Sequence, residues 1–246
     1  MAETAYLDGP NARLAYAHTP GEGPTVVFLS GYKSDMEGTK AVHLEAWAEA
    51  RGRAFLRLDY SGHGQSGGVF EEGCIGDWAQ DAQAVIEAVT EGPLVLVGSS
   101  MGGWIACLLA KRLSARLAGF VGIAAAPDFT EDGFWAGFSE EEREKVMTEG
   151  VTYLPSAYGD PYAVTKRLIE DGRENLVLRA PLPMAVPVRL MQGTEDEAVT
   201  RETALRLLDH IEGDDVQLCF VKGADHRFSE PENLAMIEAA IAEVGG

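Results

Sequence analysis

A serine, a histidine and an acidic residue in this sequence could together turn a hydroxyl group into a nucleophile. Gly98-Ser99-Ser100-Met101-Gly102 is a G-x-S-x-G pentapeptide. The apolar residues 94–97 before it predict a buried strand, and residues 104–110 after it predict a buried helix. In that context the pentapeptide predicts a sharp strand-to-helix turn that presents Ser100 as a nucleophile. The alternative is a tight connection in which Ser100 is only a turn residue.

A serine attacks a carbonyl carbon only if a base accepts its proton, and a histidine is the usual base. In a parallel sheet the base must follow the carboxyl end of a strand, because the turn points that way. His226 follows the last predicted strand and lies in a loop, which makes it the preferred base. His63, in a glycine-rich loop, is the competitor. The other histidines fall within predicted elements and are His18, His43 and His210.

The base needs an acid that orients it, and three acidic residues follow the strand predicted at residues 188–191. Asp196 is preferred, with Glu195 and Glu197 as alternatives. Asp225, next to His226, is interpreted as a solvated or capping residue.

Negative charge that develops on an acyl oxygen needs backbone N–H donors. Met101 follows the nucleophile and should supply one donor. Tyr32 should supply the other, because it lies in the loop after the strand predicted at residues 25–29, where Gly31 lets the backbone approach the substrate. The alternative is an exposed aromatic residue beside an ordinary turn.

The elements that must position these groups alternate along the chain. Such alternation, with short connections, predicts right-handed β-α-β units and a mostly parallel, doubly wound α/β sheet. An antiparallel edge hairpin is predicted at residues 4–18. Strands are predicted at 25–29, 54–58, 94–97, 117–124, 188–191 and 216–221, and helices at 40–51, 77–90, 104–110, 201–211 and 232–244.

Residues 128–186 interrupt this pattern, and we expect a small helical lid within a single domain of residues 1–246. An acidic helix is predicted at residues 139–148. The lid is rich in aromatic residues, which suit an apolar acyl pocket, although each could instead pack the lid against the body. They are Phe129, Phe134, Trp135, Phe138, Tyr153, Tyr158 and Tyr162, of which Phe134, Trp135 and Phe138 are the predicted substrate-binding residues.

Composition narrows the classes of partner. The net charge of −19 disfavours binding to nucleic acid or to an anionic membrane surface. No apolar run is long enough to insert into a bilayer. The three cysteines are too scattered for a disulfide framework or a zinc site. With no targeting pattern at the N-terminus, we expect a cytoplasmic protein, either a monomer or a dimer.

With these residues identified, the chain resembles the α/β-hydrolase superfamily over essentially its whole length. Three segments are similar to the subfamily of the mitochondrial palmitoyl-protein thioesterase that also cleaves acyl glucuronides. They read F-L-S-G-Y-K-S-D-M-E-G-T-K-A (28–41), R-L-D-Y-S-G-H-G-Q-S-G-G (57–68) and L-V-G-S-S-M-G-G-W (96–104). The resemblance implies an α/β-hydrolase fold, with Ser100 as nucleophile, Asp196 as acid, His226 as base, and Tyr32 and Met101 as oxyanion donors.

The expected function is hydrolysis of a small-molecule or protein-bound acyl thioester or carboxylic ester through an acyl-enzyme. Such a reaction requires no metal ion or organic cofactor. Two alternatives stay open: a serine peptidase or C–C hydrolase that uses the same three residues, and a non-catalytic binding protein that keeps the fold.

Overall fold

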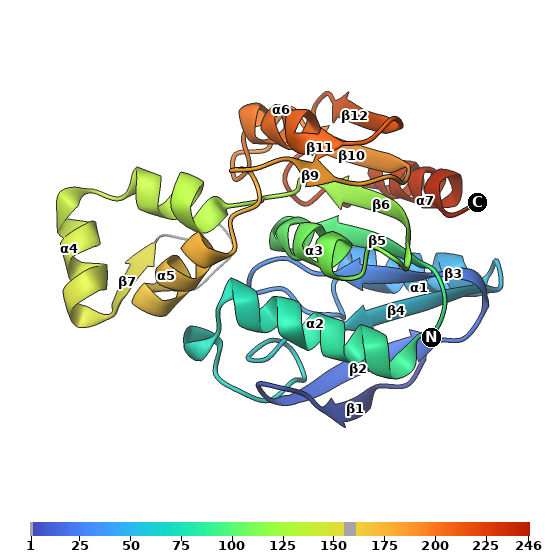
Figure 1. The fold of residues 1–246 in the computed structure, drawn as a ribbon, viewed down its shortest axis with the longest axis horizontal. Helices are drawn as coiled ribbons and strands as arrows, with labels where there is room; N and C mark the ends of the chain where they lie inside the picture. Colours follow the sequence, from blue (N-terminus) through green and yellow to red (C-terminus); the bar gives the residue numbers. More distant parts are fainter. Residues whose placement is uncertain (1, 155–160) are drawn as a thin grey trace.

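The computed structural model describes residues 2–154 and 161–246. One eight-stranded sheet has the order β1-β2-β4-β3-β5-β6-β10-β12 (Figure 1). The pairs β1–β2 and β2–β4 are antiparallel, and the other pairs are parallel. The strands are β1 Ala5–Asp8, β2 Arg13–Thr19, β3 Glu22–Leu29, β4 Arg53–Leu58, β5 Leu94–Ser99, β6 Leu117–Ile123, β10 Val188–Gly193 and β12 Val216–Val221.

Helices cover both faces of the sheet. Side chains alternate along a strand, so Val27 and Leu29 pack with α2 and α3, whereas Val26 and Phe28 pack with α1 and α7. Leu207 places α6 on the face of α2 and α3. The sheet is therefore doubly wound, as the sequence predicts. The helices are α1 Thr39–Glu49, α2 Ile75–Val89, α3 Met101–Arg112, α6 Arg201–His210 and α7 Pro231–Gly245.

The predicted elements of this body are confirmed, with small shifts at their ends. The hairpin of β1 and β2 pairs Ala5 with Tyr16 and Asp8 with Arg13. Helix α3 starts at Met101, earlier than predicted, since the turn at the serine leads directly into its first residue. Strand β3 extends back to Glu22 through the glycine-proline stretch.

Most of the described chain between β6 and β10, residues 124–187 and hereafter the β6–β10 segment, stands to one side of the sheet (Figure 1). It contains the predicted acidic helix, α4 Glu140–Glu149, whose first turn is closed by a capping box between Ser139 and Glu142. The segment is not purely helical as predicted. Its other elements are the π-helix η2 Thr130–Trp135, β7 Val151–Leu154, β8 Tyr162–Thr165, α5 Lys166–Glu174 and β9 Leu182–Pro183. Tyr158 lies outside the described residues.

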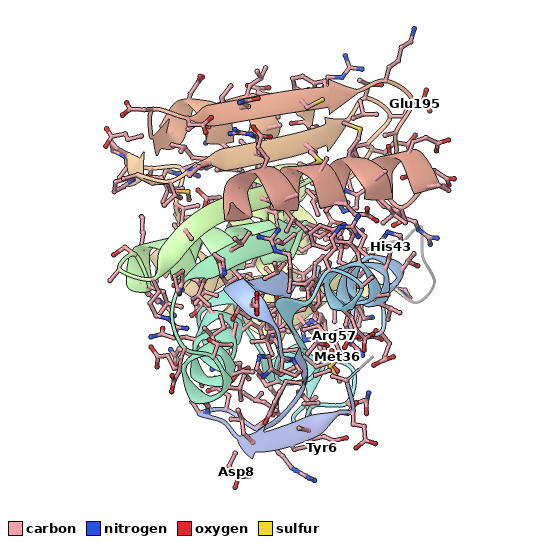
Figure 2. All side chains as sticks on the ribbon, turned by 90° about the vertical axis from the view of Figure 1, so that its right-hand side faces the viewer. Tyr6, Asp8, Met36, His43, Arg57 and Glu195 are labelled. Atoms are coloured by element: carbon pink, nitrogen blue, oxygen red, sulfur yellow. The ribbon has the colours of Figure 1, made fainter. Side chains whose placement is uncertain are left out.

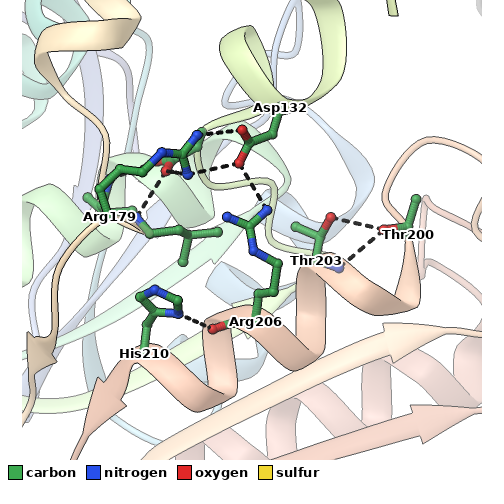
Figure 3. A network of polar contacts seen from close by, with 9 residues as sticks. Asp132, Arg179, Thr200, Thr203, Arg206 and His210 are labelled. Carbon is green, nitrogen blue, oxygen red and sulfur yellow. Dashed lines mark hydrogen bonds and ion pairs between the residues drawn. The ribbon is translucent and has the colours of Figure 1, made fainter. Parts of the chain in front are cut away.

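Charged side chains attach the start of this segment to its end and to the body (Figure 3). Both terminal nitrogens of the Arg179 guanidinium group donate to the carboxylate of Asp132. This carboxylate also accepts a hydrogen bond from Arg206 of α6 at 3.0 Å. The buried carboxylate of Asp128 accepts the amides of Val177 and Leu178 at 2.8 and 2.9 Å. The segment is thus closed at its base by polar contacts as well as by apolar packing.

Candidate active site

Ser100 lies at a strained turn between β5 and α3. Its φ of 55° and ψ of −121° are outside the regions that a residue with a side chain normally occupies. A Cβ atom on Gly98 would lie 2.3 Å from the Gly102 carbonyl oxygen, and a Cβ atom on Gly102 would lie 2.0 Å from the Leu29 oxygen. Both positions must be glycine, because the atoms in the way belong to the main chain. The pentapeptide therefore forms the predicted turn for a steric reason.

His226 reaches Ser100 from the loop between β12 and α7. Its Nε2 atom lies 3.1 Å from Ser100 Oγ, and its Nδ1 atom lies 2.8 Å from Asp196 Oδ2. The His226 side chain is 17% exposed, whereas that of Asp196 is fully buried. Residues separated by 126 positions in the sequence thus form one continuous hydrogen-bonded relay.

The Asp196 carboxylate is held by donors on both oxygens. Oδ1 accepts the amides of Ala198 and Val199, each at 2.8 Å, and Oδ2 accepts the Gln192 Nε2 group at 2.8 Å beside the His226 ring. Burial raises the pKa of Asp196, but the hydrogen bond and the charge of His226, helped by Val199 and Gln192, outweigh burial and lower that pKa below 3.8. Asp196 is thus ionised at neutral pH and fixed in orientation.

The other acidic residues near this loop point elsewhere. Glu195 and Glu197 are exposed, and Figure 2 shows Glu195 at the outer end of the molecule. Asp225 is exposed, and its Oδ1 atom accepts the amide of Phe228 at 3.0 Å, as expected for a capping residue.

His63, the competing base, is buried away from this relay. Its Nδ1 atom lies 3.2 Å from the Ser61 carbonyl oxygen, and its ring packs edge-on against Tyr60, Phe70 and Trp78. Burial lowers the pKa of His63 to about 4, although the Ser61 carbonyl opposes the shift. Its Nε2 atom has no hydrogen-bond partner among the described residues. This histidine is a neutral core residue.

Two backbone segments border the hydroxyl of Ser100. Met101 is the first residue of α3, where the N–H groups of the first turn have no acceptor within the helix. The loop after β3 passes beside the serine. A Cβ atom on Gly31 would lie only 3.3 Å from Ser100 Cβ and 3.8 Å from its Oγ. Tyr32 follows directly in that loop. The two predicted oxyanion donors therefore come from segments next to Ser100.

The Tyr32 side chain joins this loop to the β6–β10 segment. Its hydroxyl donates a hydrogen bond of 2.9 Å to the carbonyl oxygen of Ala163 in β8. Burial, aided by the charge of Glu71, raises the pKa of Tyr32, so the hydroxyl stays protonated. Five aromatic rings surround its ring at centroid distances of 4.9 to 6.0 Å, and they belong to Phe70, Trp78, Phe129, Phe134 and Tyr162.

The three predicted substrate-binding residues have different environments. Phe134 belongs to the ring cluster around Tyr32, 6.0 Å from it. The Trp135 ring packs under the guanidinium groups of Arg143 and Arg173, at 5.5 and 4.4 Å. Phe138 is buried and packs against Trp135. Only Phe134 is therefore in the aromatic cluster beside the loop that borders Ser100.

Some residues that support the site without being reactive were not predicted from the sequence. Gln192 ends a buried strand as an amide among apolar neighbours, and that mismatch was a usable signal for a polar partner. Phe70 and Trp78 were not among the predicted site residues, although they pack on Tyr32. Their spacing gave no indication of this contact.

Within residues 2–154 and 161–246, no group of three or more histidine, cysteine or acidic side chains could hold a metal ion. No helix in the same residues has the length and apolar character needed to cross a membrane.

Comparison with known proteins gives the family. A family model described as serine aminopeptidase, S33, matches residues 23–149. Human palmitoyl-protein thioesterase ABHD10, mitochondrial, is 33% identical over 243 residues, covering 98% of this chain and 79% of its own length. The chain belongs to the α/β-hydrolase family.

Solved structures agree with this assignment. A protein from Agrobacterium vitis S4, described as a hydrolase, is 37% identical with a TM-score of 0.96 and covers 100% of both chains. Mouse alpha/beta hydrolase domain-containing protein 10 is 32% identical with a TM-score of 0.91, covering 99% of this chain and 98% of its own. The α/β-hydrolase fold predicted from the sequence is confirmed, and so is the resemblance to the thioesterase subfamily. The chain is a hydrolase of the esterase and thioesterase type.

The predicted cytoplasmic location is wrong by the same comparison. The curated mammalian relatives, including those from Bos taurus and Homo sapiens, are named as mitochondrial. The prediction relied on the lack of a targeting pattern in the first residues of the sequence, and the names of these relatives contradict it.

Proposed function

We propose that this α/β-hydrolase cleaves acyl thioesters or carboxylic esters through Ser100, His226 and Asp196. The observation that supports it is the relay of 3.1 Å from Ser100 Oγ to His226 Nε2 and 2.8 Å from His226 Nδ1 to Asp196. The ionised Asp196 accepts the Nδ1 proton, so the free Nε2 atom faces the hydroxyl as a proton acceptor.

In the proposed reaction, Ser100 Oγ attacks the carbonyl carbon of the substrate while His226 accepts the hydroxyl proton. The N–H groups of Met101 and Tyr32 stabilise the negative charge on the carbonyl oxygen. His226 then protonates the departing thiolate or alkoxide, which leaves Ser100 acylated. Water attacks the acyl-enzyme with His226 again as base, and the carboxylic acid is released.

The acyl group is proposed from the relatives and from the aromatic cluster. Relatives are named as palmitoyl-protein thioesterases, which favours a long acyl chain on sulfur. Phe134, in the cluster around Tyr32, is the proposed contact for such a chain. Trp135 and Phe138, which the sequence also indicated, would act by supporting the β6–β10 segment, because their rings pack within it.

A fluorophosphonate probe tests the nucleophile directly, because it labels a serine only when its hydroxyl is activated. We expect mass spectrometry to find the label on Ser100, and Ser100→Ala to abolish both labelling and thioester turnover. Ser99→Ala changes the adjacent serine of the same pentapeptide and should leave both unchanged. Labelling of another residue, or turnover by Ser100→Ala, would refute the proposal.

A second activity deserves testing because the matching family model is described as a serine aminopeptidase. An amide leaving group needs the same three residues, so geometry does not separate the two. Matched acyl thioesters, oxygen esters and aminoacyl arylamides would separate them by kcat/KM. Preference for arylamides would replace the thioesterase proposal with a peptidase. No turnover and no probe labelling would instead indicate a non-catalytic binding protein.

A further inference from the structure

Strand β12 forms one edge of the sheet and lacks the usual protection of an edge. It reads V-Q-L-C-F-V, with no charged residue and no proline, and it pairs with β10 alone in the described sheet. The opposite edge, β1, has only four residues and ends at Asp8. Figure 2 shows β12 at the top of the sheet and β1, with Tyr6 and Asp8, at the bottom. Edge strands without charge or proline pair readily with another strand.

The backbone of β12 directs alternate residues outward. The carbonyl oxygens of Asp215 and Val221 accept the amides of Val188 and Thr194, each at 2.9 Å, so odd-numbered residues face β10. In a parallel ladder the intervening residues direct both N–H and C=O away from the neighbour. Val216, Leu218 and Phe220 therefore present their backbone groups at the free edge.

Apolar side chains accompany this edge on both faces of the sheet. Phe220 is 38% exposed, and Cys219 is exposed on the opposite face. On the face of α7, an open groove of about 280 Å³ runs along the strand. Its lining includes Gln217, Cys219, Met236, Ala239 and Glu243.

We propose that this edge binds a second copy of the chain, with the two β12 strands antiparallel and the two sheets continuous. A two-fold axis that joins antiparallel edge strands stands perpendicular to the sheet, so odd-numbered residues meet odd and even meet even. The outward N–H and C=O groups of one β12 strand then face the outward groups of the other. Antiparallel registers whose two-fold axis lies at Leu218 or at Cys219 both meet this condition over most of the strand.

Charge selects between these registers. Asp214 precedes the strand and Lys222 follows it, and both are exposed. In the register centred on Leu218, Lys222 lies opposite the partner's Asp214. The two-fold symmetry gives two such pairs in the dimer. Centring on Cys219 places Lys222 opposite the partner's Val216. Because a chain of net charge −19 repels its copy, these two complementary pairs favour the register centred on Leu218.

Disulfide crosslinking tests the register. In the proposed dimer, Gln217 lies directly opposite the partner's Cys219 as a non-hydrogen-bonded pair, with Cα atoms about 4.5 Å apart, which a disulfide can bridge. Mild oxidation of Gln217→Cys should therefore give a covalent dimer linked between positions 217 and 219. Adding Cys219→Ser should abolish it, because Cys74 and Cys107 are buried. Rapid 219–219 crosslinking of the unmodified chain would overturn the register.

Charge reversal tests the interface independently. Asp214→Lys and Lys222→Glu each place like charges together twice, so each should weaken the dimer about tenfold by sedimentation. Their combination should restore affinity to near that of the unmodified chain, and ester turnover should stay unchanged throughout. An unmodified chain that is monomeric at its highest concentration, or a dimer indifferent to both substitutions, would overturn the proposal. Neither outcome bears on the proposed nucleophile.

Discussion

Asp196→Asn tests whether the acid acts by fixing the tautomer of His226. The substitution keeps the size of the side chain but replaces one acceptor oxygen with an NH₂ donor. Both carboxylate oxygens face donors: Oδ1 faces the amides of Ala198 and Val199, and Oδ2 faces Gln192 Nε2 and His226 Nδ1. The NH₂ group must therefore face a donor in either orientation.

The two orientations differ in cost. If NH₂ replaces Oδ1, two backbone hydrogen bonds are lost, and those amides cannot rotate. If NH₂ replaces Oδ2, only the Gln192 bond is lost, and His226 accepts at Nδ1. The second orientation is favoured by about one hydrogen bond, or about 1–3 kcal/mol. It moves the ring proton to Nε2, so Ser100 loses its base.

Loss of the negative charge opposite the imidazolium adds about 1.5–3 kcal/mol to the barrier. Together these terms predict that kcat falls about 10²- to 10⁴-fold, with little change in KM. The assay is steady-state turnover of an acyl thioester or p-nitrophenyl ester. Glu195→Gln and Glu197→Gln change exposed carboxylates of the same loop and should leave kcat unaltered. A folded Asp196→Asn variant that keeps more than about a tenth of kcat would refute the reasoning.

Three further substitutions test the surroundings of the site. Gln192→Met removes a donor to Asp196, so kcat should fall about tenfold at constant KM. An unchanged kcat in the folded variant would contradict this. Gly102→Ala places a methyl group 2.0 Å from the Leu29 oxygen, so denaturant titration should show a loss of about 3 kcal/mol or more; a loss under about 1 kcal/mol would contradict the steric account of the turn. In Asp132, burial raises the pKa, but hydrogen bonds from Arg179 and Arg206 outweigh burial and lower it below 3.8. The stabilisation of the folded state by this carboxylate is therefore complete above that pH and is lost as the pH falls through the lowered pKa. Asp132→Asn should thus lower the free energy of unfolding by about 1 kcal/mol at neutral pH and flatten its fall at acid pH.

The turn at Ser100 could be predicted because its cause is local. Glycines two residues before and after the serine are required by main-chain atoms at 2.0 to 2.3 Å, and nothing distant is needed to infer this. The choice of His226 over His63 needed one more step, namely which end of the sheet each loop leaves. Strand direction follows from the alternation of strands and helices, and His226 Nε2 lies 3.1 Å from Ser100 Oγ. Its role as the base stays a prediction.

The β6–β10 segment could not be predicted to the same depth. Strands β7 and β8 read V-T-Y-L and Y-A-V-T, which are rich in strand-favouring residues but too short to show the alternation that predicts a strand. They pair with each other, from Val151–Thr165 to Leu154–Tyr162, and this pairing is a tertiary contact that the sequence does not specify. The position of Trp135 between two arginines is likewise a product of tertiary packing.

The loop after β3 is held by contacts with distant parts of the chain. The pentapeptide meets one steric condition, whereas the loop must satisfy several distant partners at once. The amide of Met36 donates to the buried Asp59 at 2.7 Å, and its carbonyl oxygen accepts from Arg57 at 2.9 Å. Figure 2 shows Met36 and Arg57 side by side in the interior. Lys40 donates to the carbonyl oxygen of Arg227, the residue after His226.

These contacts give the loop a single position relative to three parts of the site. Gly31 lies against Ser100, Tyr32 bonds Ala163 in the β6–β10 segment, and Lys40, in the first turn of α1 directly after the loop, bonds the residue after His226. A displacement of the segment would therefore act through the Tyr32 side chain on the same residue whose N–H is the proposed oxyanion donor. In the proposed mechanism, contact of a substrate with the β6–β10 segment and stabilisation of charge on its carbonyl oxygen would therefore meet at Tyr32.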